Sequence, residues 1–193
     1  MILWTIQPEE VLNEIQNNGV YRCDINKSGM KDFADLQYDW LVSQMKKRIG
    51  PPPEGVSYPV WAWYKWREDR KKPDLRAERW HCGRKGKKFY LLEVDIPDDE
   101  VLLLDFNSWI IILNEGLLSS SEEEDNELEK IYKALNAEEQ KDMQSKNWEK
   151  VFDITPFESE WTSRGDSIQA VFWELRKEQV RKFKMFISSC VYR

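Results

Sequence analysis

One stretch, Tyr58–Trp66, constrains the fold of this 193-residue chain more than any other. It reads Tyr-Pro-Val-Trp-Ala-Trp-Tyr-Lys-Trp, an aromatic run that favours a β-strand, and the segment Pro51–Gly55 before it cannot continue a helix. Because side chains alternate along a strand, two faces are predicted. They consist of Tyr58, Val60, Ala62, Tyr64 and Trp66 on one side, and of Pro59, Trp61, Trp63 and Lys65 on the other. Tyr58, Val60 and Ala62 of the first face suit a core, whereas Trp61 and Trp63 suit a ligand surface.

The rest of the chain alternates between short apolar runs and amphipathic segments. The apolar runs predict strands over Ile2–Ile6, Lys88–Asp95 and Val101–Leu104. Helical spacing predicts helices from Pro8 to Gly19, over Met30–Ile49, and from an N-cap at Asp105 to Leu117. Residues 168–187 fit one long helix by their spacing and two strands by their aromatic and β-branched content. These elements predict an α+β protein with small mixed sheets and flanking helices.

The length predicts a single domain over residues 1–193, with an acidic helical insertion at about residues 117–150. Ser121 and Glu124 match a capping box, and the acidic run Glu122–Asp125 suits a helix start. A solvated acidic helix is the simplest interpretation of this segment. A surface that binds a basic partner protein is the functional one.

Charge is distributed unevenly along the chain. The net charge is −6, yet residues 65–88 hold eleven Lys and Arg residues against four acids, and residues 89–160 hold twenty acids against five bases. Such segregation predicts an internal electrostatic match or a face that binds an anion. The overall acidity argues against a duplex-DNA-binding protein, which is usually basic.

Cysteine usage and the apolar runs bear on the cellular compartment. Cys23, Cys82 and Cys190 are too widely spaced to predict a disulfide framework, which fits a reducing cytoplasm. The N-terminus lacks the basic region and the long apolar region of a signal peptide. No apolar run approaches the ~20 residues that span a bilayer. We therefore expect a cytoplasmic protein with no membrane partner.

The catalytic motifs with the strongest sequence signatures are missing. The chain has one histidine, His81, and no zinc-ligand spacing, so no metal site is predicted. It has no P-loop, no Rossmann glycine fingerprint and no nucleophile elbow. Among the carboxylates, Glu174 is the strongest candidate because it lies in an aromatic and apolar run. The alternative for Glu174 is an acid paired with a nearby Lys or Arg, and whether the protein is an enzyme stays open.

The aromatic and basic residues between positions 58 and 88 give the positive indication of function. Trp61, Trp63 and Tyr64 offer rings on which bases stack at ~1–3 kcal/mol each, and basic side chains such as Arg76 can hold phosphates. This combination predicts a nucleotide, another small anionic ligand or single-stranded nucleic acid as the ligand. The alternative is that half of the tryptophans belong to the core and that the basic segment neutralises the acidic segment after residue 89.

Several motifs together are similar to one protein family. They are Leu3–Gln7, Tyr58–Tyr64, Lys72–Arg76, Leu92–Asp99, Leu103–Trp109 and Gln169–Leu175. They resemble the bacterial domain-of-unknown-function family DUF3841, over nearly the whole chain. The resemblance brings no known activity with it.

The order of the elements carries a second resemblance. A first strand with Trp4 and Gln7, a helix ending at Gly19, a central aromatic strand and a late strand with Gln169 look like the layout of ADP-ribosyltransferase-like folds. Those folds bind NAD in a cleft between two small sheets. The resemblance therefore favours strands over a helix for residues 168–187.

The second resemblance implies contacts for NAD as a substrate, with no further cofactor. Ribose or amide groups would be contacted by Thr5 and Gln7, a ring by Trp61, Trp63 or Tyr64, phosphate by Arg76, and the attacking group by Glu174 or Gln169. Thr5 stands where that group usually has His or Arg, and Gln169 or Glu174 stands where it has a catalytic Glu. The prediction is thus a nucleotide-binding, ADP-ribosyltransferase-like transferase. The alternative is a non-catalytic module that binds a nucleotide, single-stranded nucleic acid or a protein through its aromatic-basic surface.

Overall fold

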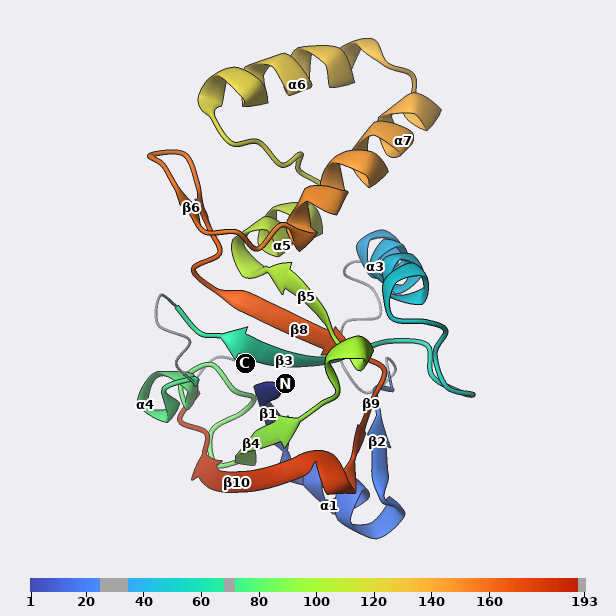
Figure 1. Cartoon of the computed structure of the whole chain (residues 1–193). Helices are drawn as coiled ribbons and strands as arrows, with labels where there is room; N and C mark the ends of the chain where they lie inside the picture. Colours follow the sequence, from blue (N-terminus) through green and yellow to red (C-terminus); the bar gives the residue numbers. More distant parts are fainter. Residues whose placement is uncertain (25–34, 68–71, 191–193) are drawn as a thin grey trace.

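The computed structural model describes residues 1–24, 35–67 and 72–190, and a six-stranded sheet runs through its middle (Figure 1). The strands lie in the order β10-β4-β1-β3-β8-β5, and all neighbouring pairs are antiparallel. Their bounds are β1 Ile2–Pro8, β3 Val60–Lys65, β4 Lys88–Asp95, β5 Leu102–Asp105, β8 Ile168–Phe172 and β10 Val180–Ile187. Two short ribbons stand apart from the sheet, β2 Val20–Arg22 with β9 Glu174–Arg176, and β6 Phe157–Glu158 with β7 Ser163–Arg164.

Helices cover both faces of this sheet, which confirms the predicted α+β class. They are α1 Glu9–Asn18, α3 Asp35–Arg48, α4 Leu75–Glu78, α5 Phe106–Leu113, α6 Glu122–Ala134 and α7 Ala137–Trp148, with short 3-10 turns at Asp98–Glu100, Glu149–Phe152 and Lys177–Gln179. α3 confirms the later part of the helix predicted over Met30–Ile49. The part of that prediction before residue 35 lies outside the described residues.

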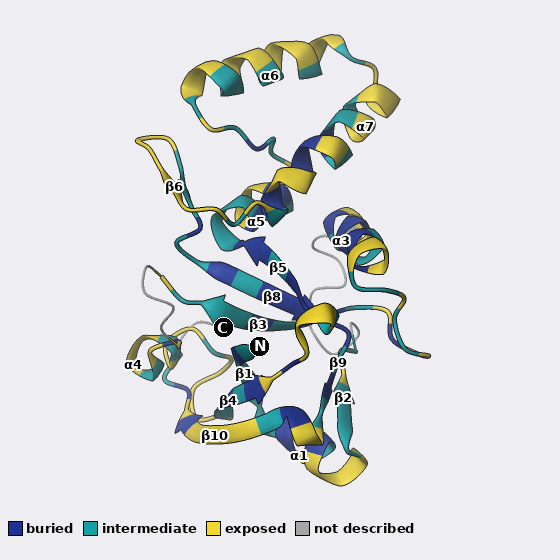
Figure 2. Ribbon diagram, viewed as in Figure 1, coloured by how far each residue is buried: buried dark blue, intermediate teal, exposed yellow. Residues whose placement is uncertain are grey.

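The sheet separates two hydrophobic cores (Figure 2). One core lies between the sheet and α1, and it contains Leu3, Leu92 and Phe172, each at most 1% exposed. The other core lies against α3, α5 and α7 and includes Leu104 and Trp148. Burying a large apolar side chain stabilises a fold by about 1.5–3 kcal/mol. The two cores therefore hold the sheet rigidly between two layers.

The first strand and helix form as predicted. β1 runs into α1 at Pro8, which lacks the N–H that a helix start leaves unpaired, and Glu9 and Glu10 follow in the first turn. Gly19 ends the helix at a φ of 80° and donates its N–H to the carbonyl of Ile15 at 3.0 Å. Glycine adopts this left-handed conformation without strain. The short helix packs β1 into the centre of the sheet.

β3 follows the predicted alternation at its start and departs from it at its end. Val60 and Ala62 are buried under α1, as the alternation requires. Between Trp63 and Lys65 the register with β8 shifts. Such a bulge turns the later side chains of a strand to new directions. Trp66 therefore packs edge-to-face on Trp63, with ring centroids 4.4 Å apart, and the face predicted for Trp66 was wrong.

The C-terminal segment forms strands and not one long helix. β8 pairs with β3 and β5, and β10 pairs with β4. The helical spacing of apolar residues does not determine the secondary structure of this segment. Its aromatic and β-branched side chains pack well between paired strands and favour the β conformation. Regular strand structure breaks at Trp173. Glu174 therefore belongs to β9, opposite Arg22 of β2, and does not continue the face of Phe172.

The predicted acidic insertion contains the helices α6 and α7 at the upper end of the molecule (Figure 1). Asn136 starts α7 with a complete capping box, in which Glu139 is the reciprocal partner. The box predicted at Ser121 is half formed. The Ser121 hydroxyl accepts the N–H of Glu124 at 3.2 Å, but the Glu124 carboxylate accepts the N–H of Ser120 instead.

Candidate functional site

The six-stranded sheet is divided into two halves at its centre. β1 pairs with β4 along its whole length, from Ile2 opposite Asp95 onward. With β3 the described residues show one register pair, Trp4 opposite Trp63. The two strands diverge beyond this pair. A fork therefore opens between the half-sheet β10-β4-β1 and the half-sheet β3-β8-β5.

A chain of side-chain hydrogen bonds holds the fork. The Thr5 hydroxyl donates to the carbonyl of Trp61 at 2.7 Å and accepts a hydrogen bond from the Gln7 amide at 2.8 Å. A buried side chain thus stands where a backbone bond would otherwise join β1 to β3. Thr5 positions the fork, whereas the carbonyl oxygen of the Gln7 amide remains as an acceptor for a ligand.

A pocket of about 240 Å³, here named the fork pocket, lies between the diverging strands. Its walls are Thr5–Gln7, Trp61–Trp63, Glu78, Cys82, Phe89 and Gln169. Drug-sized ligands occupy about 300–1,000 Å³, so the fork pocket suits one ring or sugar and not a whole dinucleotide. It brings together five residues that the sequence predicts as ligand or catalytic groups: Thr5, Gln7, Trp61, Trp63 and Gln169.

Other rings brace the two tryptophans of the fork pocket. The ring centroid of Trp61 lies 5.4 Å from that of Trp109, which belongs to the core. The ring of Trp63 lies 5.1 Å from Phe106, in addition to its contact with Trp66. Rigid aromatic walls lose little conformational entropy when a ligand binds. The site thus uses rings that the core already holds in place.

Gln169 supplies a free amide to the fork pocket. It lies on β8, directly opposite Trp63 in the strand register. Its side chain has no hydrogen-bond partner among the described residues. An amide offers one acceptor and two donors, so Gln169 can bond to both kinds of group on the edge of a ring.

The sequence does not predict two further residues of the fork pocket, because residues 67–86 read as an irregular loop. α4 and the turn after it bring Glu78 and Cys82 to the pocket, with the Cys82 N–H bonded to the Glu78 carbonyl at 3.2 Å. Burial raises the pKa of the Glu78 carboxyl, although His81 and Arg67 nearby lower it. The one feature of the sequence that relates these two residues is their spacing of four positions, which is typical of neighbours on one helical turn. That spacing does not tell which part of the sheet they reach.

Comparison with known proteins places the chain in a family. The sequence pattern of the family described as Domain of unknown function (DUF3841) matches residues 2–181. The chain belongs to the DUF3841 family. The matched region of this DUF3841 protein contains β1, β3 and β8, and hence both sides of the fork. No curated protein and no solved structure matches it.

The environment of Cys82 in the DUF3841 protein leads to a testable prediction. Burial raises the pKa of the Cys82 thiol to about 11, and the carboxylate of Glu78 adds to the effect. Because only the thiolate reacts, we expect iodoacetamide to alkylate Cys82 about a hundredfold more slowly than glutathione near pH 8. The rate should rise about tenfold per pH unit. Peptide mapping by mass spectrometry measures it.

Glu78→Gln separates this electrostatic cause from simple steric protection of the thiol. It removes a negative charge that raises the pKa of Cys82, so alkylation should become faster. A rate that is unchanged by Glu78→Gln, or one equal to that of glutathione in the native protein, would contradict the prediction.

Three predicted site residues of the DUF3841 protein lie outside the fork pocket. Tyr64 packs against the core under α1. Arg76 is exposed on α4, where its guanidinium contacts the carboxylate of Asp74 at 2.7 Å. The Glu174 carboxylate contacts Arg22 at 3.0 Å and ties β9 to β2, which is the ion-paired arrangement considered as the alternative for this acid.

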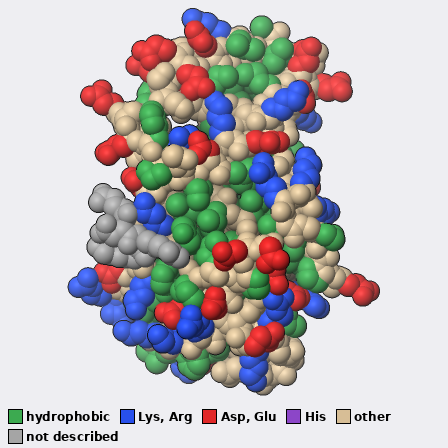
Figure 3. Space-filling view, in the orientation of Figure 1, with side chains coloured by type: hydrophobic (Ala, Val, Ile, Leu, Met, Phe, Trp, Pro, Cys, Tyr) green, Lys and Arg blue, Asp and Glu red, His purple; other side chains and the backbone are tan. Residues whose placement is uncertain are grey.

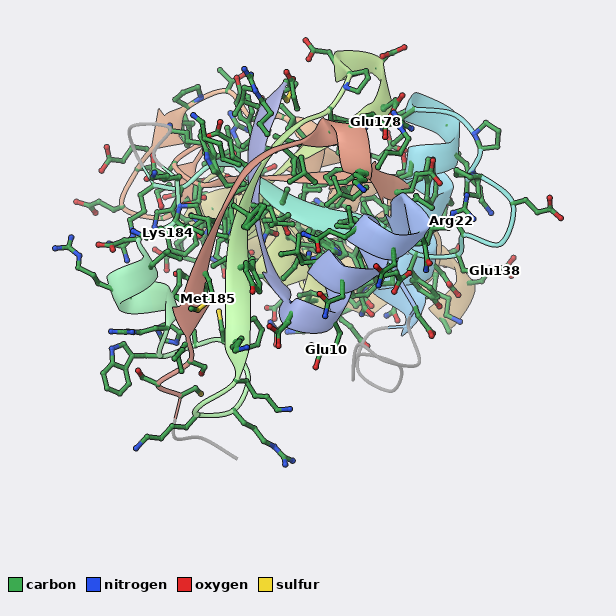
Figure 4. The ribbon with its side chains drawn as sticks, turned by 90° about the horizontal axis from the view of Figure 1, so that it is seen from below. Glu10, Arg22, Glu138, Glu178, Lys184 and Met185 are labelled. Carbon is green, nitrogen blue, oxygen red and sulfur yellow. The ribbon has the colours of Figure 1, made fainter. Side chains whose placement is uncertain are left out.

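A larger cavity of about 620 Å³, here named the basic pocket, adjoins β1 at Trp4. It is lined by the bases Lys72, Arg76, Lys182 and Lys184 and by the acids Asp74 and Glu93. Figure 3 shows Lys and Arg side chains gathered over α4 and β10, and Figure 4 shows Lys184 on β10. None of the described ion pairs joins residues 72–88 to the acidic segment 89–160. Within the pocket, Arg76 contacts Asp74 at 2.7 Å and Lys182 contacts Glu93 at 3.6 Å, whereas Lys72 and Lys184 have no ion pair among the described residues. The charge of these two lysines is open to an anionic ligand.

Two negative findings apply to the part of the chain that the structure describes. There, no three His, Cys, Asp or Glu side chains come together as a metal site requires. Also within the described ranges, no helix has the length and apolar character needed to cross a bilayer.

Proposed function

We propose that this DUF3841 protein binds a nucleotide, with a ring in the fork pocket and phosphates toward the basic pocket. One observation supports the proposal above all others. Five of the residues chosen from the sequence for nucleotide contacts line one pocket, although they come from three strands that are far apart in the chain: Thr5, Gln7, Trp61, Trp63 and Gln169.

The two pockets suit the two ends of a nucleotide. The fork pocket offers Trp61 and Trp63 for stacking and the amide of Gln169 for the polar edge of a base or of nicotinamide. The basic pocket offers lysine and arginine side chains for phosphate. The short helix α4 contributes Leu75 and Arg76 to the basic pocket and Glu78 to the fork pocket, so the two cavities flank the same helix.

We further propose NAD as the substrate and transfer of its ADP-ribosyl group as the reaction. This transfer breaks the bond between ribose C1′ and the nicotinamide nitrogen, and an acceptor bonds to C1′ and loses a proton. Glu78 is the carboxylate at the fork pocket, and burial raises its pKa, which makes its carboxylate a stronger proton acceptor. Glu78 would then take the role that the sequence assigned to Glu174. The free thiols Cys23, Cys82 and Cys190 agree with the cytoplasm as the compartment.

A non-catalytic nucleotide-binding module is the second candidate. Two residues to which the resemblance assigned a role in substrate binding or catalysis, Thr5 and Glu174, favour this candidate because both already have partners within the protein. The Thr5 hydroxyl is already engaged as donor and acceptor, and the Glu174 carboxylate is engaged by arginine. In this case Trp61 and Trp63 would stack on a nucleotide or on a base of single-stranded nucleic acid without turnover.

A thermal-shift series with NAD, ADP-ribose, ATP, nicotinamide and a single-stranded oligonucleotide tests both candidates. A ligand at a hundred times its Kd stabilises by about 2.7 kcal/mol, which should raise the Tm of a domain of this size by roughly 5–10 °C. We expect shifts with NAD and ADP-ribose that exceed the shift with nicotinamide. Nicotinamide release, followed by chromatography, then separates a transferase from a binding module. Failure of every nucleotide to raise the Tm would contradict both.

A further inference from the structure

A third cavity lies at the opposite end of the molecule from the basic pocket, between α5, α6 and the β6–β7 hairpin. It has a volume of about 530 Å³, and we name it the hairpin pocket. Its walls include the rings of Tyr132 and Trp161, the aliphatic side chain of Ile111 and three carboxylates, those of Glu115, Asp125 and Glu129. None of these residues lines the fork pocket or the basic pocket. The hairpin pocket is thus independent of the proposed nucleotide site.

Trp161 is an exposed ring that the structure nevertheless holds in one place. Its Nε1–H donates to the Ser119 hydroxyl at 3.0 Å, and that hydroxyl donates to the Asp125 carboxylate at 2.9 Å. The backbone is held as well, because the Trp161 N–H bonds to the hydroxyl of Ser159 at 3.1 Å. With 46% of its surface exposed, the indole is positioned at the pocket and not buried in a core.

The floor of the hairpin pocket is equally rigid, because α7 side chains bond to the backbone of residues 115–118. The Gln144 amide donates to the carbonyl of Glu115, and the Trp148 indole donates to that of Gly116, both at 2.8 Å. Asn147 bonds to both the N–H and the carbonyl of Leu118. A site built on supported backbone needs little ordering when a ligand binds.

The charges of the hairpin pocket are negative and only partly compensated. Glu129 contacts Lys133 at 3.0 Å on the surface of α6. Asp125 receives one hydrogen bond, from Ser119. Neither Asp125 nor Glu115 has a cationic partner among the described residues. Carboxylates next to aromatic faces are the surroundings that a guanidinium group prefers, since it stacks on rings and bonds to carboxylates in a bidentate manner.

We propose that the hairpin pocket binds an arginine side chain of a partner protein. The surroundings of the pocket suit a polypeptide better than a free small cation. α6 carries further exposed acids, including Glu122 and Glu123, on which additional basic residues of the same segment can lie. Exposed Ile111 and Phe157 offer apolar contact to the flanking residues. Figure 3 shows acidic side chains at this end of the molecule.

Fluorescence polarisation with a labelled peptide of alternating glycine and arginine tests the proposal at low ionic strength. Matched peptides carry lysine or citrulline in place of arginine. We expect the arginine peptide to bind more tightly than the lysine peptide, and the citrulline peptide, which lacks charge, not to bind. Trp161→Ala and Asp125→Asn should each weaken binding of the arginine peptide about tenfold.

Two matched variants serve as controls. Trp80 is an exposed tryptophan outside the pocket, and Glu138 is an exposed acid of α7, so Trp80→Ala and Glu138→Gln should leave the affinity unchanged. Melting curves establish that each variant is folded. Equal loss of affinity in Trp80→Ala and Trp161→Ala would overturn the proposal, as would no binding of either basic peptide. Binding of arginine amide as tightly as the peptide would overturn the assignment to a protein partner.

Discussion

Replacing Trp63 by alanine is expected to weaken nucleotide binding by the DUF3841 protein roughly tenfold to a hundredfold, because the variant loses one stacking surface worth ~1–3 kcal/mol. Isothermal titration calorimetry with whichever nucleotide raises the Tm most measures the change. Trp63 also packs on Phe106 and Trp66, so the variant will melt at a lower temperature than the native protein. The titration is therefore done well below that temperature.

Gln169→Leu tests the same pocket without removing a ring. The substitution keeps the size of the side chain but removes an amide that the described residues leave unpartnered. We expect about a tenfold loss of nucleotide affinity and little change in Tm. Trp161→Ala, at the hairpin pocket, is the control and should bind the nucleotide normally. Native affinity in both Trp63→Ala and Gln169→Leu would rule out the fork pocket as the site.

Replacing Asp105 by alanine is expected to lower the free energy of unfolding by about 3 kcal/mol or more. The carboxylate is buried, accepts hydrogen bonds from the N–H and hydroxyl of Ser108 at 2.8 and 2.7 Å, and accepts the N–H of Gly165 at 2.8 Å. It thereby caps α5 and joins β5 to the segment that precedes β8. For a domain of this size the loss corresponds to a fall in Tm of roughly 6–12 °C, measured by differential scanning calorimetry.

Asn136→Ala is the matched control for Asp105→Ala. Asn136 is also a helix N-cap, but it is exposed and bonds only within its own helix start. An exposed cap of this kind contributes about 1 kcal/mol. If Asp105→Ala costs no more than Asn136→Ala, the long-range bond to Gly165 contributes nothing and the explanation of its effect is wrong.

Local sequence patterns were sufficient to predict those elements whose bounds do not depend on contacts with other segments of the chain. Pro8, Glu9 and Gly19 delimit α1 by the chemistry of helix ends alone. The run Lys88–Asp95 forms β4 with the bounds predicted for it. Alternation placed Val60 and Ala62 of β3 on the core face correctly, because the period of a strand is a property of the chain itself.

Side-chain orientations that depend on the pairing of a strand with another strand could not be predicted from local patterns. A bulge against β8 turned Trp66 toward Trp63, and a break at Trp173 moved Glu174 into the ribbon with Arg22. Tyr64 was a ligand candidate by residue type, although its own alternation placed it on the core face, and the core is where it lies. Pairing between distant strands decides such positions, and one sequence without its partners does not contain it.

The sequence by itself determined the family and the α+β class, and it supplied the residue types on which the proposed nucleotide site rests: tryptophans for stacking, amides for polar edges and bases for phosphate. Only the tertiary structure decided where these residues meet. β1 and β3 join at Trp4 and Trp63 and then diverge around the buried hydroxyl of Thr5. That divergence creates the fork pocket, and α4 with the turn after it adds Glu78 and Cys82 to its wall. Long-range contacts between strands, unlike local spacing, set the distance between segments far apart in the chain.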